Sequence, residues 1–313
     1  MADKRKILVL VMSCNREHFI EQEKVCRETW AKPILDGAYD NIEYYSYTTD
    51  INASESYINK EKHKIFCNCD DGIYMTYQKT VECLKVLDKE GIKYDYLFRT
   101  NTSTYNNIGL LNAFVQSIEN ENIAYGGEIY NLPTLCPAPH FCYLRGNSIL
   151  LSRHLVDIIL DFDKHVSVPK VLYADDNMIG NILNTYHILR FEPYKMFIRS
   201  YGFAWYKSVE EKANNKFIKL NNGCSAWYNS DDSYDYLKNF ISIQIKNYTN
   251  RDVENKRMRY IDTILNKTKD DYTEELKFIE NYSKNAKYYY HDSVEKIDEY
   301  RDYYPPKKNK NQS

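Results

Sequence analysis

The sequence predicts an α/β protein in which a mixed, mostly parallel sheet is flanked by helices. Two observations support this prediction. Apolar runs of strand length alternate with longer amphipathic segments as far as about residue 225. Several of these runs end in clusters of polar side chains, at the strand ends where α/β proteins usually hold a ligand. A chain of 313 residues is long enough for one large domain with or without an appendage.

Strands and helices are expected to alternate regularly along the first two thirds of the chain. The runs that predict strands cover residues 5–12, 42–49, 63–68, 94–99 and 142–152. The segments that predict helices cover residues 17–30, 73–87, 111–118, 155–162 and 173–186. In the helix at 73–87, Tyr77 and Val81 share an apolar face, and Lys79 lies with other polar residues on the opposite face. Arg27 and Trp30 are expected to tie the first helix to the sheet.

The composition of the sequence changes after about residue 232. Charges of both signs become interspersed, and residues 235–245 and 272–282 have helical patterns. The expected organisation is therefore an α/β domain at 1–228, a helical extension at 229–300 and a disordered tail at 301–313.

Composition excludes some classes of function. Lys and Arg number 42 against 44 Asp and Glu, so the basic excess that phosphate contacts require is missing and nucleic acid is not an expected partner. No apolar run reaches membrane-spanning length, although peripheral contact with a membrane stays open. The oligomeric state is also open.

The cysteines favour a reducing compartment. Eight cysteines are scattered along the chain, and the Cys67-Asn-Cys69 pair lacks the further ligands of a zinc site. No signal peptide is recognisable at the N-terminus. The expectation is a cytoplasmic protein with reduced thiols.

Three polar stretches lie at strand ends or helix starts. They are Ser13–Arg16, Arg99–Thr104 and Tyr173–Asn177. Because strand ends in an open parallel sheet converge on one crevice, these stretches are expected to form a common site that offers hydroxyls, arginines and two carboxylates.

Five stretches, in order along the chain, carry a resemblance to a known family. They are ILVLVMSCNREHFIEQEKVCRETW (7–30), DDGIYMTYQKTVECL (70–84), YDYLFRTNTSTYNN (94–107), FCYLRGNSILLSRHLVDII (141–159) and YADDNMIG (173–180). Together they resemble the β-1,3-galactosyltransferase/Fringe family of inverting glycosyltransferases, which have the GT-A fold, over roughly residues 5–205. No single motif is specific, but each occurs on the element expected for it.

The resemblance implies a reaction and a set of roles. The reaction is transfer of a sugar from a nucleotide donor, such as a UDP-sugar, to a hydroxyl of a glycan acceptor with inversion of the anomeric centre. Asp176 falls on the family's general base. The expected donor-binding residues are Ser13, Arg16, Asp71, Lys79, Arg99, Asn101 and Ser103. The expected acceptor-binding residues are Asp175 and the aromatic residues Tyr173 and Trp205.

The sequence departs from the family at its metal-binding motif. Family members hold a divalent metal with an acidic D-x-D, whereas the aligned residues here are Asn101, Thr102 and Ser103. An amide and a hydroxyl without charge bind Mg²⁺ or Mn²⁺ weakly, so no metal ligand is assigned. Charge on the leaving diphosphate must then be met by fixed cations, and the candidates are Arg16, Lys79, Arg99, Arg145 and Arg199.

Other interpretations compete with these roles. Asp71, Asp175 and Asp176 all precede helical patterns and could simply cap a helix, and Lys79 could be a solvated lysine. The whole protein could be a non-catalytic glycan- or nucleotide-binding protein. A nucleotidyltransferase is disfavoured, because such enzymes need metal-binding carboxylates at this strand end.

Overall fold

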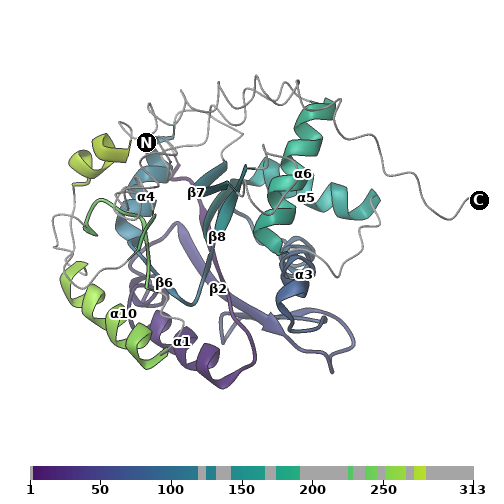
Figure 1. Ribbon diagram of the computed structural model, residues 1–313, viewed down its shortest axis with the longest axis horizontal. Helices are drawn as coiled ribbons and strands as arrows, with labels where there is room; N and C mark the ends of the chain where they lie inside the picture. Colours follow the sequence, from purple (N-terminus) through teal and green to yellow (C-terminus); the bar gives the residue numbers. More distant parts are fainter. Residues whose placement is uncertain are drawn as a thin grey trace, which may run out of the picture.

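A seven-stranded sheet with helices on both faces forms the centre of the molecule (Figure 1). The computed structural model describes residues 3–118, 125–131, 142–165, 174–190, 225–227, 237–245, 251–265 and 271–279. The central strands are parallel and the strands toward the edges are antiparallel. This confirms the predicted α/β class with a mixed, mostly parallel sheet.

The parallel strands bring the predicted polar stretches to one edge of the sheet. They are β4 (Lys64–Cys67), β2 (Ile42–Thr49), β1 (Ile7–Met12) and β5 (Tyr96–Asn101), in that spatial order. At their carboxyl ends, Met12 of β1 lies in register with Tyr47 of β2 and Asn101 of β5. The antiparallel strands are β3 (Tyr57–Asn59) beside β4, and β8 (Cys142–Ser152) followed by β7 (Tyr125–Asn131) beside β5.

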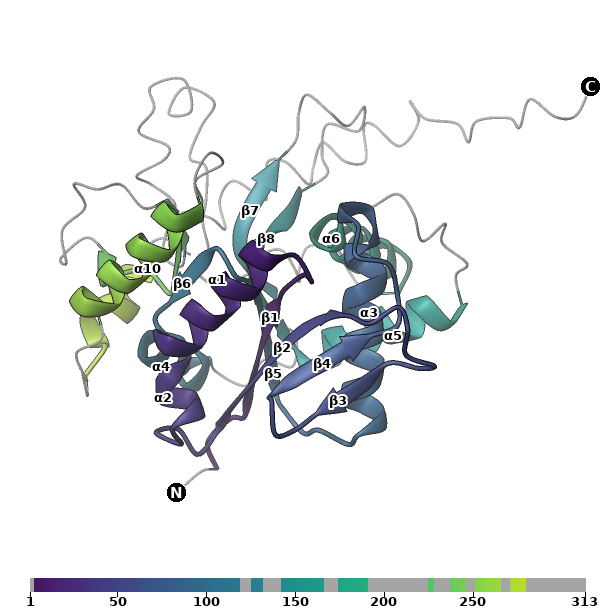
Figure 2. The same cartoon turned by 90° about the horizontal axis from the view of Figure 1, so that it is seen from below.

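Each face of the sheet has its own apolar core. Figure 2 shows α3 (Thr76–Lys89), α5 (Arg153–His165) and α6 (Asp175–Arg190) on one side of the sheet. The helices α1 (Glu17–Glu28), α2 (Lys32–Leu35), α4 (Ile108–Ser117) and α10 (Arg251–Leu265) lie on the other side. Successive side chains of a strand point to opposite faces, so Leu8 and Leu10 of β1 join the first core and Val9 and Val11 join the second.

The first helix is tied to the sheet as predicted. The Nη2 atom of Arg27 donates to Ser46 Oγ at 3.1 Å and to the backbone carbonyls of Lys62 and His63 at 2.8 and 3.0 Å. Trp30 packs edge-on against Tyr44, with ring centroids 6.1 Å apart.

A small second sheet corrects one prediction. It joins β6 (Thr104–Asn106), β10 (Ser242–Gln244) and β9 (Ser225–Trp227). The helix expected over 235–245 is wrong for residues 238–245, because β10 pairs with β6 and the flanking Ile241 and Ile245 are buried with Ile243 in the core beneath α1. The helical pattern at 272–282 is confirmed over residues 273–279. The division into domains stays a prediction, and residues 301–313 lie outside the described part of the chain.

The structure also bears on the expectations about membrane-spanning segments and about reduced cysteines. Among the described residues, no helix is both long and apolar enough to cross a membrane. Cys14, Cys26, Cys67, Cys69 and Cys83 are free thiols.

Candidate functional site

A cavity of about 360 Å³ lies where β1 and β5 end. It collects residues from four separate segments: the turn after β1 with the start of α1, the segment that leads into α3, the end of β5, and the start of α10. Six of the seven predicted donor-binding residues line it, namely Ser13, Arg16, Asp71, Lys79, Asn101 and Ser103. The seventh, Arg99, does not.

A larger hollow of about 900 Å³ lies at the opposite edge of the sheet. Its lining includes Lys6, at the entry to β1, and Asp95, at the entry to β5. Open α/β sheets hold their ligands beyond the carboxyl ends of the strands, so the smaller cavity is the candidate site.

Lys79 and Asp71 form a charged pair in the cavity wall. Lys79 Nζ lies 2.5 Å from Asp71 Oδ1 and donates to the backbone carbonyl of Ser13 at 3.0 Å. Asp71 Oδ2 accepts from the backbone N–H of Asn15 at 2.7 Å. The pair therefore connects α3 to the turn after β1.

The structure excludes two competing interpretations of this pair. Lys79 is buried rather than solvated on a polar helix face, because Asp71 supplies a counter-charge inside the fold. Asp71 does not cap α3, which begins at Thr76 after a short 3₁₀ turn at Ile73–Met75. Burial alone would raise the pKa of the Asp71 carboxyl, but the hydrogen bonds from Lys79 and from the Asn15 backbone outweigh burial and lower it.

The polar residues after β5 build a tight turn into β6. Asn101 Oδ1 accepts three hydrogen bonds, from Ser103 N at 3.1 Å, Ser103 Oγ at 3.0 Å and Thr104 Oγ1 at 2.8 Å. Thr102 Oγ1 donates to Gln22 Oε1 at 3.2 Å. The hydroxyls and the amide thus satisfy one another and the backbone where the chain leaves the sheet.

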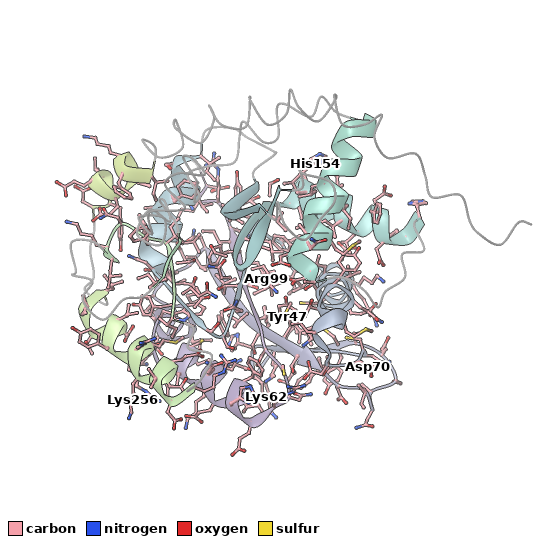
Figure 3. The ribbon with its side chains drawn as sticks, viewed as in Figure 1. Tyr47, Lys62, Asp70, Arg99, His154 and Lys256 are labelled. Carbon is pink, nitrogen blue, oxygen red and sulfur yellow. The ribbon has the colours of Figure 1, made fainter. Side chains whose placement is uncertain are left out.

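Arg99 and Asp175 form a buried ion pair behind the cavity. Arg99 Nη2 lies 2.6 Å from Asp175 Oδ2, and both side chains are about 95% buried. Arg99 Nε also donates to the Tyr47 hydroxyl at 3.3 Å, and Figure 3 shows these two side chains together at the centre of the molecule. Burial raises the pKa of Asp175 to about 6, and the Arg99 guanidinium opposes this effect.

Asp176 occupies the first turn of α6 and contacts the backbone of β8. Its Oδ2 atom accepts from Gly146 N at 3.0 Å, and its Oδ1 atom accepts from Asn177 N at 2.8 Å. The carbonyl of the same Gly146 accepts from Asn101 Nδ2 at 3.2 Å and from Arg99 Nη1. A Cβ atom at position 146 would lie 2.5 Å from Arg99 Nη1, so any larger residue here would require the Arg99 side chain to move.

The two arginines that line the cavity differ in whether their guanidinium groups already have partners. Arg16 is exposed, immediately precedes α1, and its guanidinium makes no hydrogen bond or ion pair with the described residues. Arg251 is held by Glu254, with Nη1 2.8 Å from Oε2, and lies over the Phe19 ring at 5.5 Å. Arg16 is therefore the cation that an anionic ligand meets with the least competition.

The donor atoms around the cavity do not suit a divalent metal. Asn101 Oδ1 already accepts three hydrogen bonds, and Asp71 is paired with Lys79. Within the described ranges, no three His, Cys, Asp or Glu side chains gather closely enough to hold a metal, and this includes the Cys67-Asn-Cys69 segment. Hard cations need free carboxylate oxygens, and this wall of the cavity does not offer a set of them.

Some predicted site residues lie outside the described part of the chain, and some residues at the site were not predicted. Tyr173 and Trp205, the predicted acceptor aromatics, lie outside the described residues, as does Arg199. Sequence reasoning did not assign a role in the site to Asn15, Thr76 or Gly146. Thr76 lines the cavity, and its Oγ1 accepts from the backbone N–H of Asp175 at 3.0 Å. The signal for Gly146 was a glycine inside a strand pattern, which marks a close approach of backbone to another group.

Comparisons with known proteins give distant structural likenesses. No protein-family model matches the sequence, and no curated protein matches it. A glycosyltransferase involved in the glycosylation of the major capsid of PBCV-1 is 10% identical, with a TM-score of 0.39, covering 82% of this chain and 99% of that one. The mannosyltransferase PcManGT from Pyrobaculum calidifontis, in complex with GDP-Man and Mn²⁺, is 10% identical with a TM-score of 0.34, covering 63% of each chain. The glycosyltransferase GlyE of Streptococcus pneumoniae TIGR4 is 11% identical with a TM-score of 0.37, covering 84% of this chain and 62% of that one.

Proposed function

We propose that the protein is an inverting glycosyltransferase of the cytoplasm that moves a sugar from a nucleotide-sugar donor, UDP-linked, to a hydroxyl of a glycan. The observation that carries the proposal is the link between the cavity and Asp176. Asn101 in the cavity wall and the Asp176 carboxylate contact the same residue, Gly146, through its carbonyl and its N–H. A carboxylate is thereby linked to a cavity whose lining includes Arg16, a cation without a partner among the described residues.

The proposed chemistry assigns a role to each part. The nucleotide diphosphate binds in the cavity, with Arg16 and Lys79 as the donors to its phosphate oxygens. The acceptor hydroxyl attacks the anomeric carbon from the side opposite the diphosphate, and Asp176 takes the hydroxyl proton. The bond from the anomeric carbon to the phosphate oxygen breaks, and the cations stabilise the charge on the leaving diphosphate.

The test is a panel of UDP-, GDP- and CMP-linked sugars, each assayed for release of free nucleotide with and without glycan acceptors. We expect Asp176→Asn to lower turnover about 100-fold or more, because the amide cannot accept the proton. The melting temperature should change little, since the amide oxygen still accepts one of the two backbone hydrogen bonds. The matched control is Asp70→Asn, an exposed aspartate next to Asp71 in the sequence, which should keep its activity.

Other outcomes identify the alternatives. Binding of a nucleotide without turnover would favour the non-catalytic binding protein, and near-normal transfer by Asp176→Asn would remove Asp176 from the mechanism. Asp175→Asn should lower stability and should slow turnover less than Asp176→Asn does. It leaves Arg99 buried without a counter-charge, which costs about 3–5 kcal/mol for a buried pair.

The donor set of the cavity predicts that transfer does not depend on a divalent metal. Most of the activity should survive EDTA, and added Mn²⁺ should raise it only modestly, because fixed cations replace the metal at the diphosphate. Arg16→Gln should then weaken donor binding and slow transfer. Complete loss of activity in EDTA with recovery in Mn²⁺ would show that Asp70, Asp71 or Asp175 holds a metal.

A further inference from the structure

We propose that Arg99 is a positioning residue that sets the place of the Asp176 carboxylate through the Gly146 peptide and Asp175, and that it does not bind the donor. This inference rests on the proposed function of Asp176. It assigns to Arg99 a role different from the donor contact that its place at a strand end first indicates.

Arg99 is enclosed by groups that engage each of its three guanidinium nitrogens. Its Nη2 atom pairs with Asp175 at 2.6 Å and lies 3.2 Å from Met12 Sδ. Its Nε donates to the Tyr47 hydroxyl at 3.3 Å, and its Nη1 donates to the Gly146 carbonyl. Only 3% of the residue is exposed, and it is absent from the cavity lining. Because Arg16 and Lys79 line the cavity and Arg99 does not, a diphosphate bound there meets the first two cations and not Arg99.

Two of these contacts connect Arg99 to Asp176, one through Asp175 and the other through Gly146. Through Asp175, Arg99 fixes the first residue of α6, which Thr80 Oγ1 also holds by donating to Asp175 Oδ2 at 3.2 Å. Through the Gly146 carbonyl, Arg99 orients the residue whose N–H donates to Asp176 Oδ2. The planar guanidinium makes these bonds in fixed directions, which a lysine ammonium cannot reproduce.

Arg99→Lys tests the proposal because it keeps the charge beside Asp175 but cannot bridge to Gly146 in the same geometry. The matched control is Arg27→Lys, an arginine that also donates to several internal acceptors but lies between α1, β2 and the turn at Lys62 and His63. Both variants lose hydrogen bonds of a partly or fully buried arginine. Only Arg99→Lys should disturb Asp176.

The first readout does not require activity. The chain has ten glycines, so 15N-glycine labelling gives a small set of amide signals. The Gly146 amide signal should move in Asp176→Asn, because its acceptor changes. It should move in the same direction in Arg99→Lys and stay in place in Arg27→Lys. An unmoved Gly146 signal in Arg99→Lys overturns the proposal, whatever the enzyme assay gives.

The second readout is kinetic, with the nucleotide sugar that the panel identifies. Arg99→Lys should lower kcat about tenfold or more while KM for the donor stays within about threefold, because misplacing a catalytic group slows the chemical step. The double variant Arg99→Lys with Asp176→Asn should be no slower than Asp176→Asn alone. A rise in KM at unchanged kcat would instead mean that Arg99 binds the donor, and would overturn the proposal.

A folding failure does not remove the test. If Arg99→Lys cannot be purified, Tyr47→Phe removes the acceptor of Arg99 Nε and leaves the ion pair with Asp175. That variant should lower kcat severalfold with KM unchanged and move the Gly146 signal, and wild-type kcat together with an unmoved signal would refute the proposal. A wild-type rate for Asp176→Asn with a Gly146 signal that moves in Arg99→Lys would refute the proposed base and retain the positioning contact.

Discussion

Glu23 is a buried acid whose carboxylate has partners on two strands. It lies on α1, with its Oε2 atom 2.9 Å from Lys64 Nζ of β4, and its Oε1 atom accepts from Ser46 Oγ of β2 at 2.6 Å. Burial alone would raise the pKa of Glu23, but Lys64 and Ser46 outweigh burial and lower it. The folded state therefore stabilises the ionised Glu23 carboxylate more than the unfolded state does.

The lowered pKa predicts how stability depends on pH. The contribution of Glu23 is fully present above its unfolded pKa of about 4.3 and is lost as the pH falls through its lower folded pKa. Glu23→Gln should cost about 2 kcal/mol at pH 7, and its melting temperature should approach that of the wild type as the pH falls from about 5 to 3. Asp40→Asn, at an exposed pair with Lys4, is the control and should change little at any pH. A difference in melting temperature between the wild type and Glu23→Gln that grows as the pH falls would contradict a lowered pKa of Glu23.

At the scale of elements, α10 completes the core beneath α1. Met258 of α10 is fully buried and its sulfur lies 3.8 Å from Cys26 Sγ of α1. Glu254, also fully buried, accepts from Gln22 of α1. The helix is thus joined to the α/β domain by packing and by a buried polar contact.

This packing predicts that α10 unfolds with the domain. Met258→Ala should lower the free energy of unfolding by about 2–5 kcal/mol, the cost of a cavity in a core, within a single transition in urea. Tyr260→Ala is the matched control on the same helix, because Tyr260 is 52% exposed, and should change stability by less than about 0.5 kcal/mol. If α10 were only loosely attached, Met258→Ala would leave the main transition unchanged.

At the scale of the whole molecule, the sequence predicts the order of elements better than it predicts which charges are buried. Periodicity is a local property, so β1, α3 and β5 follow from the sequence, and the polar ends of β1 and β5 indicated one shared edge. The burial of Lys79 and Arg99 depends on Asp71 and Asp175, which reach them only through the fold. A helical pattern carries no information about such partners, so it cannot show that Lys79 is buried.

The same limit explains the error at 235–245. The segment has helical spacing, but its isoleucines are β-branched and β6 offers an unpaired strand edge beside them. Tertiary pairing then decides between the two structures. The contact of Gly146 with both Asn101 and Asp176 is likewise a product of sheet register, since β8 lies antiparallel to β5.

The pairing of β6 with β10 has a consequence for synthesis. Asn106 and Ser242, which hydrogen bond across these strands, lie 136 residues apart. At a translation rate of about 5–20 residues per second, the chain waits on the order of ten seconds before the second partner leaves the ribosome. During this interval Tyr105, Ile108 and Phe114, which finally share a core with Phe240 and Ile243, must be kept from aggregation by other contacts. The core on this face of the sheet is therefore completed only after Phe240 and Ile243 have left the ribosome.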